Sequence, residues 1–277
     1  LDTQRFIRKE ELISAIVDSV DKILKDNNLK RTNLLGVGLG LPGPIDYEKG
    51  IVHFFPNVPG WKEVSLKTIL EGRLRLPVFV DNDAKAMCLA EYKLGAAKGS
   101  TNAICITLGT GVGGGLIING KLYRGLSNAA GEIGHMPINE EGRLCNCGGR
   151  ACLEAYVGNN RISKEAKGIF RRDITLEELS YLAKKQNRQA KNIWLRVAER
   201  LSVALVGAVN LLNPDCIVIG GGVAGAGKIL FDNIRRIIAL RAMSVQAKRV
   251  KVFKAKLGNN AGLIGAAIMV KENITGL

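Results

Sequence analysis

The sequence predicts an α/β fold, in which buried strands alternate with amphipathic helices. Several short apolar runs have the length of buried strands, and stretches with helical periodicity separate them. With 277 residues, 47% of them hydrophobic, the chain is long enough to bury the core of one large domain or two small ones. Alternation of the two kinds of element favours α/β over the all-helical and all-strand classes.

The first third of the chain predicts two helices and two strands. Residues 7–28 have the spacing of an amphipathic helix, and the apolar run 34–41 follows as a strand that ends at the turn residues PGPID. We expect a loop from there through residue 60. A second strand at 76–80 leads into a helix at 83–94. The apolar face of the first helix is formed by Leu12, Ile16, Val20, Ile23 and Leu24.

The remaining elements follow the same alternation. A strand at 103–109 runs into a glycine-rich turn and a further apolar run, in which Asn119-Gly120 signals a hairpin. Asn213-Pro214 ends the longest helical pattern. The last predicted helix is rich in Gly and Ala, so it needs close packing. Helices are predicted at 175–186, 190–212, 228–240 and 261–272, and strands at 216–220 and 250–255.

Charge and composition narrow the function classes. Forty Lys and Arg against twenty-five Asp and Glu give +15, but the basic residues are spread out, which favours a solvated surface over a nucleic-acid interface. The surface would also attract a small anion such as ATP. With 5% aromatic residues, stacking on single-stranded nucleic acid is disfavoured. The polar start LDTQRFIRKEE and the lack of a long apolar run predict a soluble cytoplasmic protein without membrane contact.

Three of the six cysteines lie within eight residues of one another. Cys145, Cys147 and Cys152 fall in a loop that contains two glycines, and His135 lies ten residues upstream. This set can close a tetrahedral zinc site, and four protein ligands would make it structural. The alternative is a loop of free cysteines beside a core histidine. The other three cysteines stand singly among apolar residues and are expected to be buried.

Two glycine-rich segments are candidates for phosphate binding. The segment 109–115 leads into a strand, whereas Rossmann and P-loop turns lead into helices. A strand–turn–strand hairpin of this kind is how ribonuclease H-like (actin-like) ATPases build their phosphate loops; the alternative is a tight hairpin. The segment 220–225 satisfies G-x-G-x-x-G, and its place before a helix suits a nucleotide at the helix N-terminus. A lone match is a weak signal, and the alternative is close helix–strand packing. Because the strand 250–255 ends without an acidic residue for a ribose, a dinucleotide-dependent oxidoreductase is disfavoured.

Polar residues in apolar surroundings form a further set. Asn82 and Asp83 directly follow a predicted strand, and Glu132, His135 and Glu154 flank the cysteines. Carboxylates and amides of this kind suit the hydroxyls of a polyol, and one carboxylate could act as a base. The alternatives are a helix cap for Asp83 and capping or supporting roles for the glutamates.

At these residues the chain resembles the ROK family of repressors, uncharacterised open reading frames and sugar kinases, and within it the bacterial glucokinase group. The resemblance covers nearly the whole chain in order. The matching stretches are GLGLPGPID (38–46), FPNVPGW (55–61), VDNDAKAMCLAE (80–91), TLGTGVGGGLIING (107–120), AGEIGHM (130–136), CNCGGRACLEAY (145–156), NLLNPDCIVIGGGVAGAG (210–227) and AGLIGAA (261–267).

The resemblance implies a two-lobed sugar kinase fold of the ribonuclease H-like class. Residues 1–100 with 261–277 would form the small lobe, and 101–260 the large lobe with a structural zinc loop and the nucleotide site. Asp83 would be the general base, and Mg²⁺ would accompany ATP. The sugar would be bound by Asn57, Asn82, Asp83, Glu132, His135 and Glu154, and the nucleotide by Gly109, Thr110, Gly111, Gly113, Gly220, Gly221 and Gly222.

Two departures from the family pattern stand out. Ala151 occupies a position where the family has glycine, which matters only if that position needs a positive φ. No Asp-x-Gly-x-Thr phosphate loop occurs in the sequence. We expect a segment of a few dozen residues that carries it to precede residue 1; the alternative is that the chain as given is not catalytic.

The predicted activity is ATP-dependent phosphorylation of a hexose, with glucose to glucose 6-phosphate favoured over N-acetylmannosamine, fructose and allose. A homo-oligomer, dimer or tetramer, is expected from the resemblance. The alternative is a sugar-sensing repressor whose DNA-binding module lies outside this sequence. Retention of Asp83 and of both glycine segments favours the kinase, because a sensor needs neither.

Overall fold

The computed structural model describes the chain except residues 1–4, 56–57, 59 and 277. It divides into two compact units, which here are called unit 1 and unit 2. Unit 1 comprises Leu1–Ala90, Arg124–Ala130 and Asn260–Leu277, and unit 2 comprises Glu91–Tyr123 and Gly131–Asn259. Each unit combines strands with helices, so the predicted α/β class is confirmed.

Two small sheets form the centre of unit 1. Strand β1 (Val37–Leu41) pairs in parallel with β5 (Val78–Asn82), and both were predicted. The second sheet is antiparallel and consists of β2 (Ile45–Asp46), β3 (Ile51–Phe54) and β4 (Lys62–Ser65). The expectation of a loop through residue 60 is therefore wrong. Two to four residues per strand are too few for an alternation pattern to be recognised.

The helices α1 (Lys9–Asp26) and α2 (Leu66–Leu74) pack beside each other in unit 1. Helix α1 was predicted, but its buried face is narrower than expected, since Ile23 is 56% exposed. Helix α2 was not predicted. It buries Leu66, Leu70 and Leu74, which follow one another at the four-residue spacing of a helix face.

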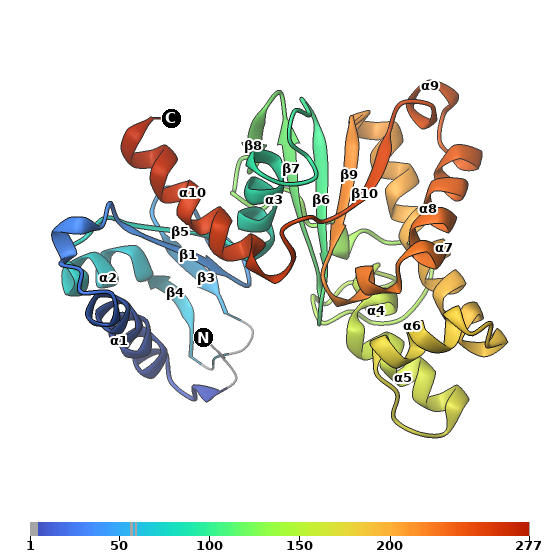
Figure 1. Cartoon of the computed structure of the whole chain (residues 1–277), viewed down its shortest axis with the longest axis horizontal. Coiled ribbons are helices and arrows are strands. Elements are labelled where there is room, and N and C mark those ends of the chain that lie inside the picture. Colours follow the sequence, from blue (N-terminus) through green and yellow to red (C-terminus); the bar gives the residue numbers. More distant parts are fainter. Residues whose placement is uncertain (1–4, 56–57, 59, 277) are drawn as a thin grey trace. The chain divides into compact units, whose positions relative to one another are not determined.

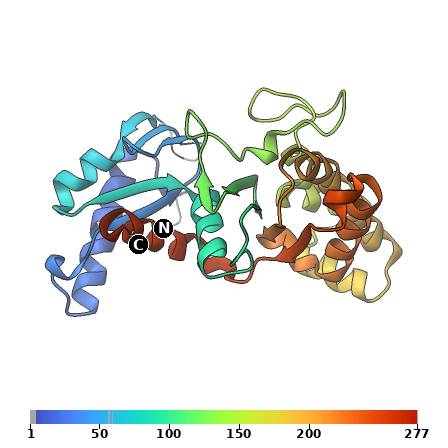
Figure 2. The ribbon, with the colours of Figure 1, turned by 90° about the horizontal axis from the view of Figure 1, so that it is seen from above.

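The C-terminal helix α10 (Ala261–Thr275) packs on β1 and β5 within the same unit, and Figure 2 shows it beside these strands. Its contact with α3 (Asp83–Lys93) is close. A Cβ added at Gly265 would lie 1.8 Å from the Ala86 carbonyl oxygen, so this contact requires glycine. The close packing predicted from the small residues of the helix is therefore present.

A five-stranded mixed sheet forms the centre of unit 2, with the order β10-β9-β6-β7-β8 (Figure 1). The β7–β8 connection places Asn119 and Gly120 at φ of 50° and 74°, as the hairpin signal predicted. Strand β6 pairs in parallel with β9 and antiparallel with β7. The strands are β6 (Ala103–Leu108), β7 (Val112–Ile118), β8 (Lys121–Tyr123), β9 (Cys216–Gly220) and β10 (Lys251–Lys254).

Helices pack against this sheet to complete unit 2. The long helix α7 (Arg188–Leu212) buries Trp194 and packs on α8 (Lys228–Arg241). It ends at Asn213, whose left-handed conformation precedes Pro214, as predicted. The shorter helices are α4 (Glu154–Val157), α5 (Asn159–Phe170), α6 (Leu176–Lys184) and α9 (Ser244–Ala247). Among the described residues, every helix is too short or too polar to cross a membrane.

Candidate active site

Asp83 is the first residue of α3 and directly follows β5. Its Oδ1 accepts the Ala84 N–H at 2.8 Å. The side chain is accessible to solvent, yet the protein around it removes part of its hydration. This desolvation raises the pKa of the Asp83 carboxyl, and the backbone hydrogen bond from Ala84 offsets only part of the effect. A carboxylate with a raised pKa at an accessible position is suited to accept a proton.

Asn82, and not Asp83, caps the helix. Its Oδ1 accepts the N–H groups of Ala84 at 3.0 Å and Lys85 at 3.2 Å, and its Nδ2 donates to the Gly43 carbonyl at 3.2 Å. The capping interpretation therefore belongs to the neighbouring residue. The Asp83 carboxylate remains available for chemistry. The Asn82 amide is used at both ends for structure, but the Gly43 contact needs only one of its two Nδ2 hydrogens.

The predicted metal ligands His135, Cys145, Cys147 and Cys152 come together, with one ligand atom of each within 4.8 Å of the others. The sulfurs of Cys147 and Cys152 are 3.7 Å apart, as are Cys145 Sγ and His135 Nδ1. Tetrahedral zinc with Zn–S of about 2.3 Å and Zn–N of about 2.0 Å separates its ligands by about 3.5–3.8 Å. The residues present therefore fit zinc.

The cysteine loop, residues 145–152, is a tight backbone structure. The Cys145 N–H donates to the Gly149 carbonyl, the Gly148 N–H donates to that of Cys145, and Gly148 has a φ of 89°. Burial raises the pKa of the Cys152 thiol to about 12, whereas the Gly149 N–H lowers that of Cys147. Three adjacent thiolates need a compensating cation, which a divalent metal would supply.

Ala151 lies in this loop with a φ of 58°, so the position is one that favours glycine. The departure from the family pattern therefore places an alanine in the left-handed region, which costs about 1 kcal/mol. Its side chain is buried, and its carbonyl accepts the Ile138 N–H at 2.9 Å.

His135 faces two different groups with its two ring nitrogens. Nδ1 points to the Cys145 sulfur, and Nε2 lies 3.9 Å from Glu132 Oε2. Glu132 directly precedes the short helix Ile133–His135, and His135 is the last residue of that helix. An imidazole that ligates a metal through Nδ1 carries its proton on Nε2, so this arrangement would present an N–H donor beside the Glu132 carboxylate.

Glu154 follows the cysteine loop and begins α4. Its Oε2 accepts the Val112 N–H at 2.7 Å. A Cβ added at Gly111 would lie 2.4 Å from Glu154 Oε2, so position 111 requires glycine. Glu154 is thereby attached to the turn between β6 and β7.

The two glycine turns lie at the same end of neighbouring strands. The first, Gly109–Gly111, follows β6, and the second begins at Gly220, which is opposite Thr107 in the parallel β6–β9 pairing. Gly221 has a φ of 83°, and an added Cβ would lie 2.3 Å from the Leu108 carbonyl oxygen. The first turn is shorter than the sequence indicated: Gly113–Gly115 belong to β7, where they leave room for Gly131 beside Gly114.

Asn159 is a residue of this region that sequence reasoning missed. Its N–H donates to the Gly109 carbonyl at 2.8 Å, and its amide lies 3.2 Å from the position of an added Cβ at Gly222. Its Oδ1 is buried and has no hydrogen-bond partner among the described residues. Asn159 therefore contacts both glycine turns. Its place after Gly158, at the start of a helical pattern, was the available signal.

The predicted site residues are distributed over both units. Asn82 and Asp83 belong to unit 1, whereas Glu132, His135, Glu154, the cysteine loop and both glycine turns belong to unit 2. Asn57 lies outside the described residues. Within unit 2 the structure brings the cysteine loop together with His135, and Glu154 together with the first glycine turn. The roles in sugar and nucleotide binding remain predictions.

Comparisons with known proteins show the family of this chain. A family model described as the ROK family matches residues 1–273. The glucokinase of Halalkalibacterium halodurans is 36% identical over 272 residues, which cover 93% of this chain and 82% of that protein. The xylose repressor of Caldicellulosiruptor bescii is 30% identical over 275 residues, which cover 95% of this chain and 69% of the repressor.

A solved structure extends the likeness to three dimensions. A ROK family glucokinase from Streptomyces griseus, in complex with glucose and AMPPNP, superposes with a TM-score of 0.83 at 31% identity. The match covers 96% of this chain and 89% of that chain. The predicted ribonuclease H-like (actin-like ATPase) fold is thereby confirmed.

Proposed function

From the premise that this chain belongs to the ROK family, we propose that it is an ATP-dependent hexose kinase that converts glucose to glucose 6-phosphate. The observation that carries the proposal is Asp83, an accessible carboxylate with a raised pKa that is not used as the helix cap. Relatives named glucokinase support the sugar and the reaction type.

Asp83 acts as the general base of the reaction. It accepts the proton of the sugar 6-hydroxyl while the hydroxyl oxygen forms a bond to the γ-phosphorus of ATP. The bond from that phosphorus to the β–γ bridging oxygen breaks, and ADP leaves. Mg²⁺ bound to ATP would supply neutralisation of charge on the phosphates. The products are the phosphorylated sugar, ADP and a proton on Asp83 that passes to solvent.

The sugar-binding residues are Asn57, Asn82, Glu132, His135 and Glu154. The Nε2–H of His135 and the Glu132 carboxylate offer a donor and an acceptor side by side, which suits adjacent sugar hydroxyls. Structural zinc bound by His135 and the three cysteines would hold the imidazole through Nδ1 and so fix the direction of Nε2–H.

The nucleotide is bound by the two glycine turns, Gly109–Gly111 with Gly113 and Gly220–Gly222. Glycine at these turns lets phosphate approach the backbone closely and exposes N–H donors to it. Their position at the carboxyl ends of the parallel strands β6 and β9 supports this assignment.

A sugar-responsive repressor is the second candidate, since a relative named xylose repressor covers 95% of this chain at 30% identity. Such a protein needs to bind a sugar but has no use for a base or for phosphate-binding turns. Asp83 and both glycine turns are retained in this chain, which favours the kinase.

A substrate panel tests the proposal. The full-length protein is incubated with Mg-ATP and glucose, mannose, fructose, allose, N-acetylmannosamine or xylose, and ADP formation is measured by a coupled assay. We expect the highest kcat/KM with glucose. If calorimetry shows that a sugar binds but none of the sugars in the panel is phosphorylated, the result would support the repressor and contradict the kinase.

A further inference from the structure

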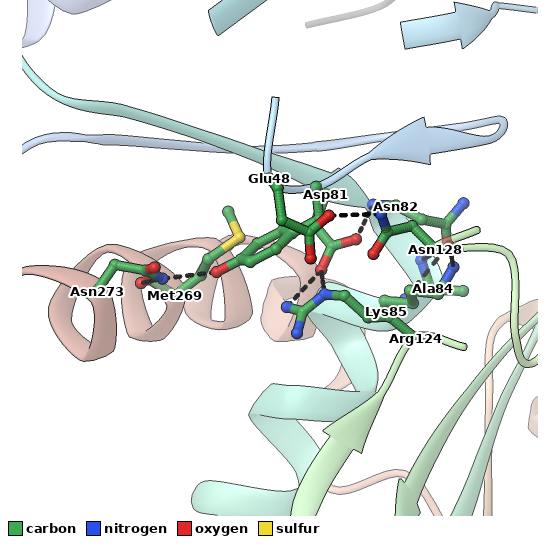
Figure 3. A network of polar contacts seen from close by, with 10 residues as sticks. Glu48, Asp81, Asn82, Ala84, Lys85, Arg124, Asn128, Met269 and Asn273 are labelled. Carbon is green, nitrogen blue, oxygen red and sulfur yellow. Dashed lines mark hydrogen bonds and ion pairs between the residues drawn. The ribbon is translucent and has the colours of Figure 1, made fainter. Parts of the chain in front are cut away.

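The segment Arg124–Ala130, called the strap below, belongs to unit 1, whereas the chain before and after it belongs to unit 2. Its first residue makes a buried ion pair. Arg124 donates from Nε at 3.1 Å and from Nη2 at 2.8 Å to Asp81 Oδ2, as Figure 3 shows. The Asp81 side chain is only 3% exposed. A carboxyl group this deeply buried would be costly without such a hydrogen-bonded partner.

The other end of the strap is attached at a second point. Lys85 Nζ donates to the Asn128 carbonyl at 2.8 Å, and both residues are buried (Figure 3). Asn128 has a φ of 58° and donates from Nδ2 to Glu48 Oε2 at 2.6 Å. The Asn128 carbonyl thus accepts a hydrogen bond from the charged Lys85, and the Asn128 side chain donates one to the Glu48 carboxylate.

Arg124 also stacks on an aromatic ring. Its guanidinium lies 3.6 Å from the centroid of the Tyr47 ring, and the Tyr47 hydroxyl accepts a hydrogen bond from Asn273 Nδ2 at 2.6 Å. A planar guanidinium that stacks on an aromatic ring while it donates twice to a carboxylate has little freedom to turn. The direction of the Arg124–Asp81 contact is therefore fixed by four segments of unit 1.

The two attachment points lie on either side of Asp83. Asp81 precedes it by two residues and Lys85 follows it by two, and each is bound to the strap. The second carboxylate oxygen of Asp81 accepts the N–H of Asn82 at 2.8 Å, which orients the residue that caps α3. The strap therefore holds the junction of β5 and α3 both before and after the proposed base.

We propose that Arg124 and Lys85 are positioning residues of phosphoryl transfer, which act through the β5–α3 junction to hold the Asp83 carboxylate in its working orientation. The inference rests on the proposed function, in which Asp83 is the base. Neither side chain is required to touch a substrate. A reacting group that is displaced by about 1 Å can lose up to about a hundredfold in rate, so a positioning role has a measurable consequence.

The test is a double-mutant cycle in the full-length protein with Mg-ATP and the sugar it phosphorylates. We expect Arg124→Gln to lower kcat about tenfold while both KM values change less than threefold, and Arg124→Lys to recover part of the loss. In the Asp83→Asn background the same change should lower kcat no further, because the residue acts through Asp83. A purely structural loss would multiply with that of Asp83→Asn.

Arg235→Gln is a matched control. Arg235 also donates from Nε and Nη2 to one oxygen, the Val252 carbonyl, and lies over an aromatic ring, but it belongs to unit 2 and its partners are not next to Asp83 in the sequence. Its substitution should leave kcat unchanged. If Arg124→Gln does not fold, as judged by thermal unfolding, Lys85→Met is carried through the same cycle.

Two outcomes contradict different claims. Normal kcat in the strap variants, or an equal loss in the Asp83→Asn background, overturns the positioning role while the kinase stands. Normal turnover by Asp83→Asn itself contradicts the proposed function.

Discussion

The carboxylate of Glu154 accepts the backbone N–H of Val112 at 2.7 Å. Glu154 lies two residues after Cys152, the last cysteine of the cysteine loop. One side chain thus joins that loop to the turn between β6 and β7, where the Gly111 backbone leaves no space for a Cβ. A loop stiffened by four metal ligands would therefore also stiffen a glycine turn. This gives a structural zinc ion a consequence for the site, although zinc would take no part in the chemistry.

Replacing Asp83 by asparagine should lower turnover strongly and spare sugar binding. Asparagine keeps the size of the side chain, and the cap on α3 is supplied by Asn82, so the helix start should persist. It cannot accept a proton, and we expect phosphoryl transfer to fall at least about a hundredfold while glucose affinity is nearly unchanged. Isothermal titration beside a coupled ATP assay measures both quantities.

Glu154→Gln is the contrasting variant for that experiment. Its proposed contact with the sugar exists already in the ground state, so the change should weaken sugar binding more than it lowers turnover. Equal loss of kcat in both variants would argue against the assignment of Asp83 as the only base.

The pH dependence should follow the raised pKa of Asp83. The base must be ionised to accept a proton, and desolvation favours its protonated form. The inactive form therefore persists to higher pH than for an ordinary aspartate, whose pKa is about 3.9. We expect kcat/KM to fall on the acid side with a midpoint above that value. Fluorescence of the buried Trp61 and Trp194 at each pH shows whether the fold persists, and a midpoint at or below that of free aspartate would contradict the prediction.

About one zinc ion per chain should copurify with the protein. His135→Ala with Cys147→Ser removes two of the four ligands, and metal analysis should then show its loss. Cys147 is exposed, so its replacement costs little packing. Cys88→Ala, at a buried cysteine outside the cluster, is the control that should retain zinc. Full retention in the double variant would show that the ion is held elsewhere.

The sequence predicted those parts whose signals are local. The periodicity of α7, the apolar run of β9 and the spacing of Cys145, Cys147 and Cys152 each need only a short window to be recognised. The helix and the strand are confirmed, and the three cysteines do lie together. The strands β2 to β4 are too short to show a period. The contact of Asp81 with Arg124 joins residues 43 positions apart, and no local pattern indicates such a pair. The glycines at 113–115 suggested a turn because glycine is common in turns. Their pairing with β6 makes them part of a strand instead.

Substitutions at two glycines of the first turn distinguish an effect on folding from an effect on nucleotide binding. A Cβ at Gly111 would collide with Glu154 Oε2 at 2.4 Å, so Gly111→Ala should disturb the turn even without a ligand.

A Cβ at Gly109 would meet nothing within 4 Å, so Gly109→Ala should fold with unchanged thermal stability. If this turn cradles phosphate, the added methyl group blocks the approach of the nucleotide, and we expect KM for ATP to rise about tenfold with the KM for the sugar unchanged. Gly168→Ala, at another open position but within α5, should leave both KM values as they are. An unchanged KM for ATP in Gly109→Ala would exclude close contact between this residue and the phosphates, and it would leave the second turn at Gly220–Gly222 as the candidate for nucleotide binding.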